Sequence, residues 1–248
     1  MPGDLMVEVR EEEEVGYLVL RLSGRLSLRT VPRVREAVVK SLLGVGRVVI
    51  DLSRLRSPRA SFLTVFPSAL GVAGGWPSAK LVLFGAEAEL RSALVSARIT
   101  ETVPLTADLA SALAILDQRP PQVRRHRDLP QHETAALAAR LFVRETCDTW
   151  SVPPAVRDVA ELISSELVTN AVEHAHTTSQ LTLTCTRSTL QISVRDYRPT
   201  PTPRPRPIDI NALRGRGLHL VAALAQAWDV DPHPDGKTVW VSLRLDER

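Results

Sequence analysis

The sequence predicts two domains, an N-terminal α/β domain and a C-terminal α+β sandwich, joined by a short linker. The length of 248 residues is more than one ordinary domain needs. Strand-like and helix-like segments alternate in the first half, which is typical of a mostly parallel sheet covered by helices. In the second half two long helical segments precede paired strands, which is typical of helices packed on an antiparallel sheet.

In the first half, the periodicity of apolar residues predicts the strands and helices. Strands are expected at 17–23, 48–50 and 80–84, and helices at 31–43, 63–72, 86–97 and 106–117. Residues 117–127 contain Pro120, Pro121 and several arginines, and they break both periodicities. We therefore expect one domain at 1–117, a linker at 118–127 and a second domain at 128–248.

The second half reads as helices followed by alternating strands. Helices are expected at 133–149, 154–175 and 218–227, a hairpin at 181–186 and 190–195, and a closing strand at 239–245. A proline-rich loop at 199–207 separates the hairpin from the third helix.

Composition and charge speak against some classes of function, namely nucleic-acid binding and a role in a membrane. Of the residues, 44% are hydrophobic and 24% are charged, and the net charge is +3, as in an ordinary soluble globular protein. The strongest basic cluster, at 124–127, is short and lacks an aromatic residue, which speaks against direct nucleic-acid binding. The uncharged stretch at 60–79 is long enough to span a bilayer, but prolines and a glycine pair interrupt it. We expect a buried helix, a turn and a strand there, and no membrane partner.

The cysteines and the N-terminus indicate a cytoplasmic protein. Cys147 and Cys185 lack the spacing of metal ligands, so we expect free, buried thiols. The acidic run at 11–14 is unlike a secretory signal peptide.

The first candidate binding and catalytic residues lie on the predicted helix at 154–175. Glu166 and Asn170 are one turn apart at the edge of its apolar stripe, and His174 follows a turn later. A carboxamide oxygen can ligate Mg²⁺, and a carboxylate can act as a base on a hydroxyl. Taken alone, the same residues also fit a solvated helix edge.

Two further features point to a phosphate-bearing ligand. Asp196 directly follows an alternating strand, where the floor of a pocket often lies. Gly215 and Gly217 precede a predicted helix, whose first N–H groups could bind an anion. A dinucleotide fingerprint would need a third glycine where Leu220 stands, and Gly236 belongs to no P-loop, because a strand follows it.

In this order and spacing the motifs resemble the GHKL ATPase family with its Bergerat fold, and in particular its anti-sigma serine kinase branch, over about residues 125–246. The resemblance implies that Asn170 ligates Mg²⁺ and that Glu166 is the general base. It implies that Asp196 accepts the adenine amino group of ATP, assisted by Thr238. It also implies a phosphate cradle made by Gly215, Arg216, Gly217 and Leu218. The family's second motif continues Asp-x-Gly-x-Gly, whereas here Tyr-Arg-Pro-Thr follows Asp196, so we expect the proline-rich segment at 199–207 to replace the usual lid.

The first half resembles the STAS domain of anti-sigma-factor antagonists over about residues 6–117, on the Leu-Ser-Gly step at 22–24 and the Val-Val-Ile-Asp-Leu-Ser run at 48–53. In that family a turn carries a phosphorylated serine between an acid and a glycine. This chain keeps Ser61 but has Arg59 and Phe62 at the flanking positions. An ordinary helix-start serine and a phosphosite both remain open. We expect that Phe62 blocks access, that Ser61 is not a substrate of the chain's own kinase domain, and that the N-terminal half is a docking or inhibitory module.

The resemblances imply a regulator of sigma-factor partner switching that binds ATP·Mg²⁺ and phosphorylates a serine of a STAS-type antagonist, with a sigma factor as a further partner. The main alternative is a non-catalytic binding module that nucleotide only gates. A histidine kinase fragment is a weaker alternative, because His126 and His132 lie in or beside the predicted linker and not on a helical hairpin. The oligomeric state stays open.

Overall fold

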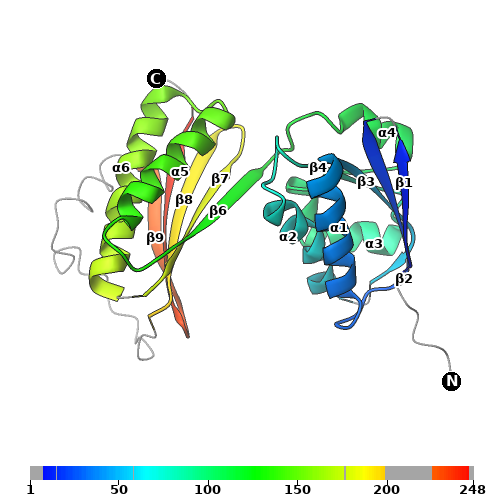
Figure 1. The fold of residues 1–248 in the computed structure, drawn as a ribbon, viewed down its shortest axis with the longest axis horizontal. Helices are drawn as coiled ribbons and strands as arrows, with labels where there is room; N and C mark the ends of the chain where they lie inside the picture. The colour runs from blue at the N-terminus through cyan, green and yellow to red at the C-terminus, as the bar shows by residue number, and fades with distance from the viewer. Residues whose placement is uncertain (1–7, 15, 58, 176, 199–224, 246–248) are drawn as a thin grey trace. The chain divides into compact units, whose positions relative to one another are not determined.

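The computed structural model describes residues 8–14, 16–57, 59–175, 177–198 and 225–245. The chain forms two compact units, Met1–Val123 and Arg124–Arg248. Each unit is built on its own sheet of five strands (Figure 1). The two-domain fold class predicted from the sequence is confirmed.

The first unit contains a mixed sheet in the order β1-β2-β3-β4-β5. Its strands are β1 (Glu8–Glu14), β2 (Tyr17–Arg25), β3 (Arg47–Arg56), β4 (Lys80–Phe84) and β5 (Leu105–Thr106). The strands from β2 to β5 run parallel, as the alternation of elements predicts, and β1 pairs antiparallel with β2. Both edge strands were missed. β1 has a charged residue at nearly every position and β5 is two residues long, so neither gives an apolar period.

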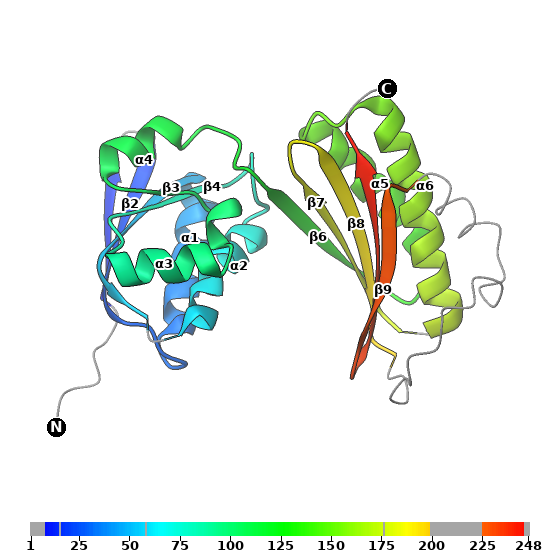
Figure 2. The same ribbon diagram turned by 180° about the vertical axis from the view of Figure 1, so that it is seen from behind.

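Helices cover both faces of this sheet (Figures 1 and 2). They are α1 (Val31–Val45), η1 (Ala60–Thr64), α2 (Val65–Val72), α3 (Ala88–Ser96), η2 (Ile99–Glu101) and α4 (Leu109–Ile115). The apolar sides of α1, α2 and α3 pack in one cluster with β2, β3 and β4, while α4 packs with the opposite face. The stretch at 60–79 therefore contributes η1 and α2 to the core, as predicted. In the described part of the chain, no helix combines the length and apolarity needed to cross a membrane.

The serine at the predicted phosphosite lies in η1. Ser61 is exposed, whereas Phe62 is partly buried and packs against the apolar cluster under the helices. The ring therefore contributes to the core, and the expected steric block of the hydroxyl by Phe62 is not supported. That Ser61 is not a substrate of the chain's own kinase domain stays a prediction.

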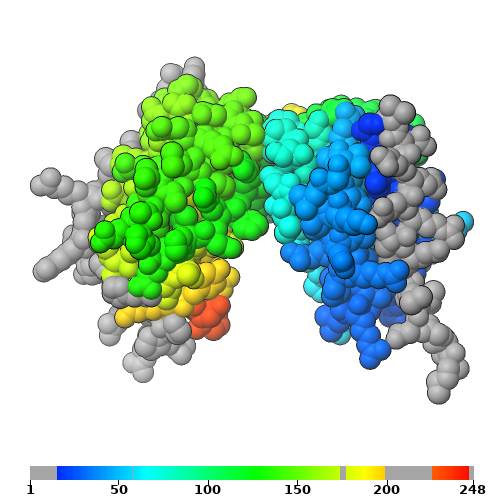
Figure 3. All heavy atoms as spheres, viewed as in Figure 1, coloured from blue at the N-terminus to red at the C-terminus, as the bar shows by residue number. Residues whose placement is uncertain are grey.

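The second unit contains a sheet in the order β6-β7-β8-β10-β9. Its strands are β6 (Val123–Leu129), β7 (Ser179–Cys185), β8 (Thr189–Asp196), β9 (Ala227–His233) and β10 (Gly236–Arg244). Two helices, α5 (Ala135–Thr149) and α6 (Pro154–Asn170), lie on one face, and their side chains form the outer surface of this side (Figure 3). A π-helical turn, η3 (Ala171–Ala175), extends α6. Among the described residues no helix covers the other face, which is seen in Figure 2.

The predicted linker differs from the structure, because residues 123–127 belong to β6. Val123 and Leu129 are buried at the two ends of this strand. Between them, the guanidinium of Arg125 lies 5.5 Å from the centroid of the Phe142 ring, and its Nη2 is 3.2 Å from Glu145 Oε1. An arginine that covers an aromatic ring takes the place of an apolar residue, so the strand has no alternating signal in the sequence.

The segment predicted as a helix at 218–227 lies outside the described residues up to 224. Its last residue, Ala227, begins β9. This edge strand contains two aspartates and Pro232, which are uncommon in strands, so composition did not indicate it.

Gly236 generates the first testable prediction. Its φ is +152°, and a Cβ built there would collide with the backbone carbonyl oxygen of Asp196. Gly236→Ala should lower the free energy of unfolding by about 1–3 kcal/mol, measured by urea denaturation. Gly44→Ala is the control, because Gly44 lies within α1 with nothing within 4 Å of the added carbon. The control should raise stability by roughly 0.5–1 kcal/mol. Equal behaviour of the two variants would contradict the close contact at Gly236.

Cys147 and Cys185 are both buried and lie outside any disulfide, as predicted. Burial raises the pKa of Cys147 from 9.0 to about 12, so the folded protein keeps this thiol protonated at a pH where the unfolded chain loses the proton. Stability should therefore fall as pH rises above 9. Between pH 8.5 and 10.5 wild type should lose about 2 kcal/mol more than Cys147→Ala, measured by urea unfolding at each pH. The same loss in both proteins would show that the thiol is not protected.

Candidate functional site

The orientation of α6 is fixed by an ion pair with α5. Glu161 is buried, and it accepts two hydrogen bonds from Arg144, at 2.8 Å from Nε and 2.7 Å from Nη2. Arg157, one turn before Glu161, brings its Nε within 3.8 Å of the same carboxylate. A bidentate pair of this kind has strict geometry, so it restricts rotation of α6 about its axis.

The rotation of α6 about its axis determines which of its side chains are buried and which can contact a ligand. Ile163, Leu167 and Val168 are buried, and α6 packs on β8 and β10. Glu166 and Asn170 are half-buried and lie one turn apart, as predicted. No hydrogen bond or ion pair joins either side chain to another residue in the described ranges, so a carboxylate and a carboxamide are free to bind a ligand.

The end of α6 lies beside the end of β8. Directly after η3, the Oγ1 of Thr177 accepts a hydrogen bond of 3.2 Å from the backbone N–H of Tyr197. Tyr197 is the residue after Asp196, the last residue of β8. The helix end with Asn170 and the strand end with Asp196 therefore lie at the same end of the sheet. π-helical turns such as η3 are frequent at functional sites.

Asp196 faces the helices and is 4% exposed. Along β8 it continues the row of alternate buried residues that includes Ile192 and Val194. Its Oδ1 accepts a hydrogen bond of 3.3 Å from the backbone N–H of Arg198, and its Oδ2 lies 2.8 Å from Lys237 Nζ. The carboxyl group is thus buried and held by two donors.

The structure places Thr238 on the opposite face of the sheet from Asp196. In the pairing of β8 with β10, Asp196 is opposite Lys237, and Thr238 is opposite Arg195. Because successive side chains of a strand point to opposite faces, Thr238 is directed away from the helices. Its Oγ1 lies 2.9 Å from His233 Nε2. The side chain of β10 that contacts Asp196 is therefore Lys237, and the predicted pairing of Thr238 with Asp196 is wrong.

A third polar residue completes the row. Ser179 on β7 is directly opposite Asp196, so the two side chains share a face. Ser179 is buried, and its Oγ has no hydrogen-bond partner among the described residues. Sequence reasoning missed both Ser179 and Lys237. In the sequence, the one indication was the alternation of side chains along β10: Lys237 lies two residues before the apolar Val239, so the two share a face. Which residue of β8 lies beside Lys237 follows only from the register between the two strands.

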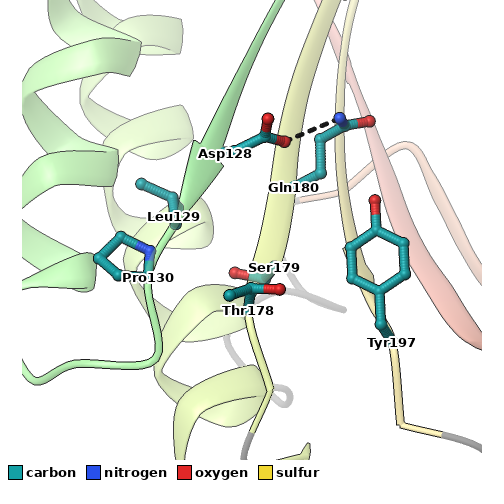
Figure 4. Close-up of a pocket in the computed structure, with 7 residues that line it drawn as sticks. All are labelled: Asp128, Leu129, Pro130, Thr178, Ser179, Gln180 and Tyr197. Atoms are coloured by element: carbon teal, nitrogen blue, oxygen red, sulfur yellow. Dashed lines mark hydrogen bonds between the residues drawn. The ribbon is translucent and has the colours of Figure 1, made fainter.

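Two cavities lie near this end of the domain. One, of about 440 Å³, is lined by Asp128, Leu129, Pro130, Thr178, Ser179, Gln180 and Tyr197. In Figure 4 the side chains of Gln180 and Tyr197 lie alongside each other, and Gln180 Nε2 donates to Asp128 at 2.9 Å. The other, of about 630 Å³, is lined by Gln131, His132, Glu133, Ala136, Thr169, Val172 and Glu173. Glu166, Asn170, Asp196 and Thr238 line neither cavity.

The remaining predicted site residues cannot be placed. Gly215, Arg216, Gly217 and Leu218 lie outside the described residues, as does the side chain of His174. Within the ranges that are described, no three His, Cys, Asp or Glu side chains are grouped as metal ligands would be.

Comparisons with known proteins cover both halves of the chain. Residues 129–243 match the family model of the histidine kinase-like ATPase domain. A comparison with curated proteins finds no match. Among solved structures, an anti-sigma factor antagonist from Mycobacterium paratuberculosis is 20% identical, with 44% of this chain and 93% of that chain covered and a TM-score of 0.40.

Two other solved structures show the same range of similarity. A STAS domain protein from Planctomyces limnophilus is 18% identical, with 45% of this chain and 98% of that chain covered and a TM-score of 0.39. The RsbU and RsbW domains of a Mycobacterium tuberculosis protein are 21% identical, with 50% of this chain and 33% of that chain covered and a TM-score of 0.40. The match of residues 129–243 to the histidine kinase-like ATPase domain agrees with the resemblance predicted from the sequence for the second half of the chain. The first half has the alternating strands and helices that were predicted for it.

Proposed function

We propose that this chain is a regulator of sigma-factor partner switching, whose C-terminal domain binds ATP·Mg²⁺ and phosphorylates a serine of a STAS-type antagonist in the cytoplasm. One observation carries the proposal. In a domain that matches the histidine kinase-like ATPase family, Glu166 and Asn170, which have no partner among the described residues, and the buried Asp196 lie at one end of the same sheet. A carboxamide, a carboxylate and a buried acceptor are the groups that this chemistry requires.

The roles follow from the chemistry of each group. The carboxamide oxygen of Asn170 suits a hard cation such as Mg²⁺ and would be the chain's own ligand to it, with phosphates and water completing the shell. When bound, the metal neutralises charge on the phosphates. Asp196 accepts a hydrogen bond from the adenine amino group. Glu166 takes the proton from the attacking serine hydroxyl, because its carboxylate has no other partner among the described residues.

The remaining roles rest on the resemblance alone. We assign the phosphate cradle to Gly215, Arg216, Gly217 and Leu218. We assign docking or inhibition to the N-terminal domain, and we propose a sigma factor as the partner that phosphorylation of the antagonist releases or captures.

A second candidate function is a binding module in which nucleotide only sets partner affinity. A specific observation favours it: both oxygens of Asp196 are already engaged, by Lys237 and by the Arg198 backbone. The family's glycines after this aspartate are also absent. Turnover of ATP with and without a STAS-type partner separates the two functions.

Asn170→Ala tests the metal ligand. The variant loses the one oxygen that the chain offers to Mg²⁺, so binding of a fluorescent ATP analogue in the presence of Mg²⁺ should fall at least about tenfold. Thr169→Ala, at the neighbouring position of α6, is the matched control and should bind as wild type does. Unchanged affinity in Asn170→Ala would remove Asn170 from the site.

Glu166→Gln tests the base. The amide keeps the shape of the side chain but cannot accept a proton, so nucleotide binding should persist while phosphoryl transfer to the partner serine falls by about 10²–10⁴-fold. Glu173→Gln, which changes an exposed acid farther along the chain, should transfer phosphate normally. If Glu166→Gln transfers phosphate as fast as wild type, Glu166 is not the base. If wild type transfers none to any STAS-type partner, the binding module is the correct function.

A further inference from the structure

We propose that Lys237 makes the base-binding site accept guanine as well as adenine, so that the ligand class of the ATPase domain is the purine nucleoside triphosphates. This inference rests on the proposed nucleotide binding and concerns its selectivity. It is carried by a row of three polar side chains on the helix-facing side of the sheet: Ser179 on β7, Asp196 on β8 and Lys237 on β10.

The row is defined by strand pairing. Asp196 is directly opposite Ser179 on one side and Lys237 on the other, and directly opposite residues of antiparallel strands share a face. Ser179 and Asp196 are buried, while the Lys237 side chain is 38% exposed. The row therefore has a rigid buried end and an ammonium group at its open end that can move toward a ligand.

A buried carboxylate alone discriminates between the two purines. Carboxylate oxygens only accept hydrogen bonds, so Asp196 would bind the amino group at position 6 of adenine. Guanine has a carbonyl oxygen at that position, and two acceptors facing each other without a donor leave both unsatisfied in a buried site. In the orientation that adenine takes, a site with Asp196 but without Lys237 would disfavour guanine for this reason.

Lys237 removes this basis for rejection. Its ammonium carries three donors and no acceptor, and only one donor is needed for the contact of 2.8 Å with Asp196 Oδ2. Another donor can meet the guanine carbonyl while Asp196 accepts from the adjacent ring N–H. With adenine, Asp196 accepts from the amino group and Lys237 donates to the adjacent ring nitrogen.

Ser179 fits a site of this kind. A hydroxyl both donates and accepts, so it can adapt to either base. The Oγ of Ser179 is buried without a partner among the described residues, and buried hydroxyls are usually satisfied. A ligand at this row would supply the missing hydrogen bond.

The experiment measures binding of ATP, GTP and CTP, each with Mg²⁺, to the full chain by titration calorimetry. Wild type should bind GTP within about tenfold of ATP, and CTP at least about tenfold more weakly than either. Lys237→Met keeps the length of the side chain and removes the donors. It should weaken GTP at least about tenfold while ATP changes less than about threefold. Lys237→Arg keeps donors and should retain GTP binding.

The outcomes separate this inference from the proposed function. Preference of wild type for ATP by a hundredfold or more overturns the inference and leaves ATP binding intact. Equal weakening of both purine nucleotides by Lys237→Met, or CTP binding as tight as GTP, also overturns it. Absence of binding by all three nucleotides overturns the proposed function as well. Circular dichroism checks that Lys237→Met is folded, and Lys237→Leu, which also has no hydrogen-bond donor, replaces it if it is not.

Discussion

The close contact between Gly236 and the backbone of Asp196 is the constraint on which the rest of the second domain depends. No side chain fits at position 236, because its first carbon would occupy the space of the Asp196 carbonyl. The contact fixes the register between β8 and β10, and with it the face on which every later residue of β10 lies. A slip of one residue would place Thr238 beside Asp196 and turn Lys237 away. Gly236 therefore determines which side chains lie beside Asp196, although it has no side chain of its own.

The same register satisfies a charge that the fold could not otherwise bury. Asp196 is 4% exposed, and an ionised carboxylate at such a position needs a partner of opposite charge or several donors. Lys237 and the Arg198 backbone supply them. The same two carboxylate oxygens of Asp196 thus serve the stability of the fold and the proposed ligand binding. Any nucleotide that binds Asp196 must share it with Lys237. Glu161 in the helix layer shows the contrasting case, since Arg144 and Arg157 hold it and it has only a structural role.

How far the sequence could predict this molecule depends on the range of the interactions involved. The helices α1, α5 and α6 and the central strands have strong apolar periods, and they were predicted at these positions, although β3 extends six residues beyond the predicted strand at 48–50. The edge strands β1, β5, β6 and β9 were missed, because one free edge lets charged residues, proline or a length of two residues stand where a central strand needs apolar alternation. Glu166 and Asn170 share a helix, so local spacing placed them together. Lys237 and Ser179 meet Asp196 only through strand pairing, which no local pattern reveals.

The proposed kinase and the proposed binding module differ in whether Glu166 on α6 acts as a base, and not in the residues at the end of β8. The departures from the family's second motif, and the pairing of Asp196 with Lys237, are confined to the end of β8 and its neighbours, where a base would be read. Glu166 lies on α6, whose orientation is set independently by Glu161 and Arg144. An altered end of β8 can therefore change which nucleotide binds and how tightly without changing Glu166, the residue that we propose as the base. In the structure the Glu166 carboxylate is half-buried and without a partner among the described residues, so the changes at the end of β8 leave the proposed base in place.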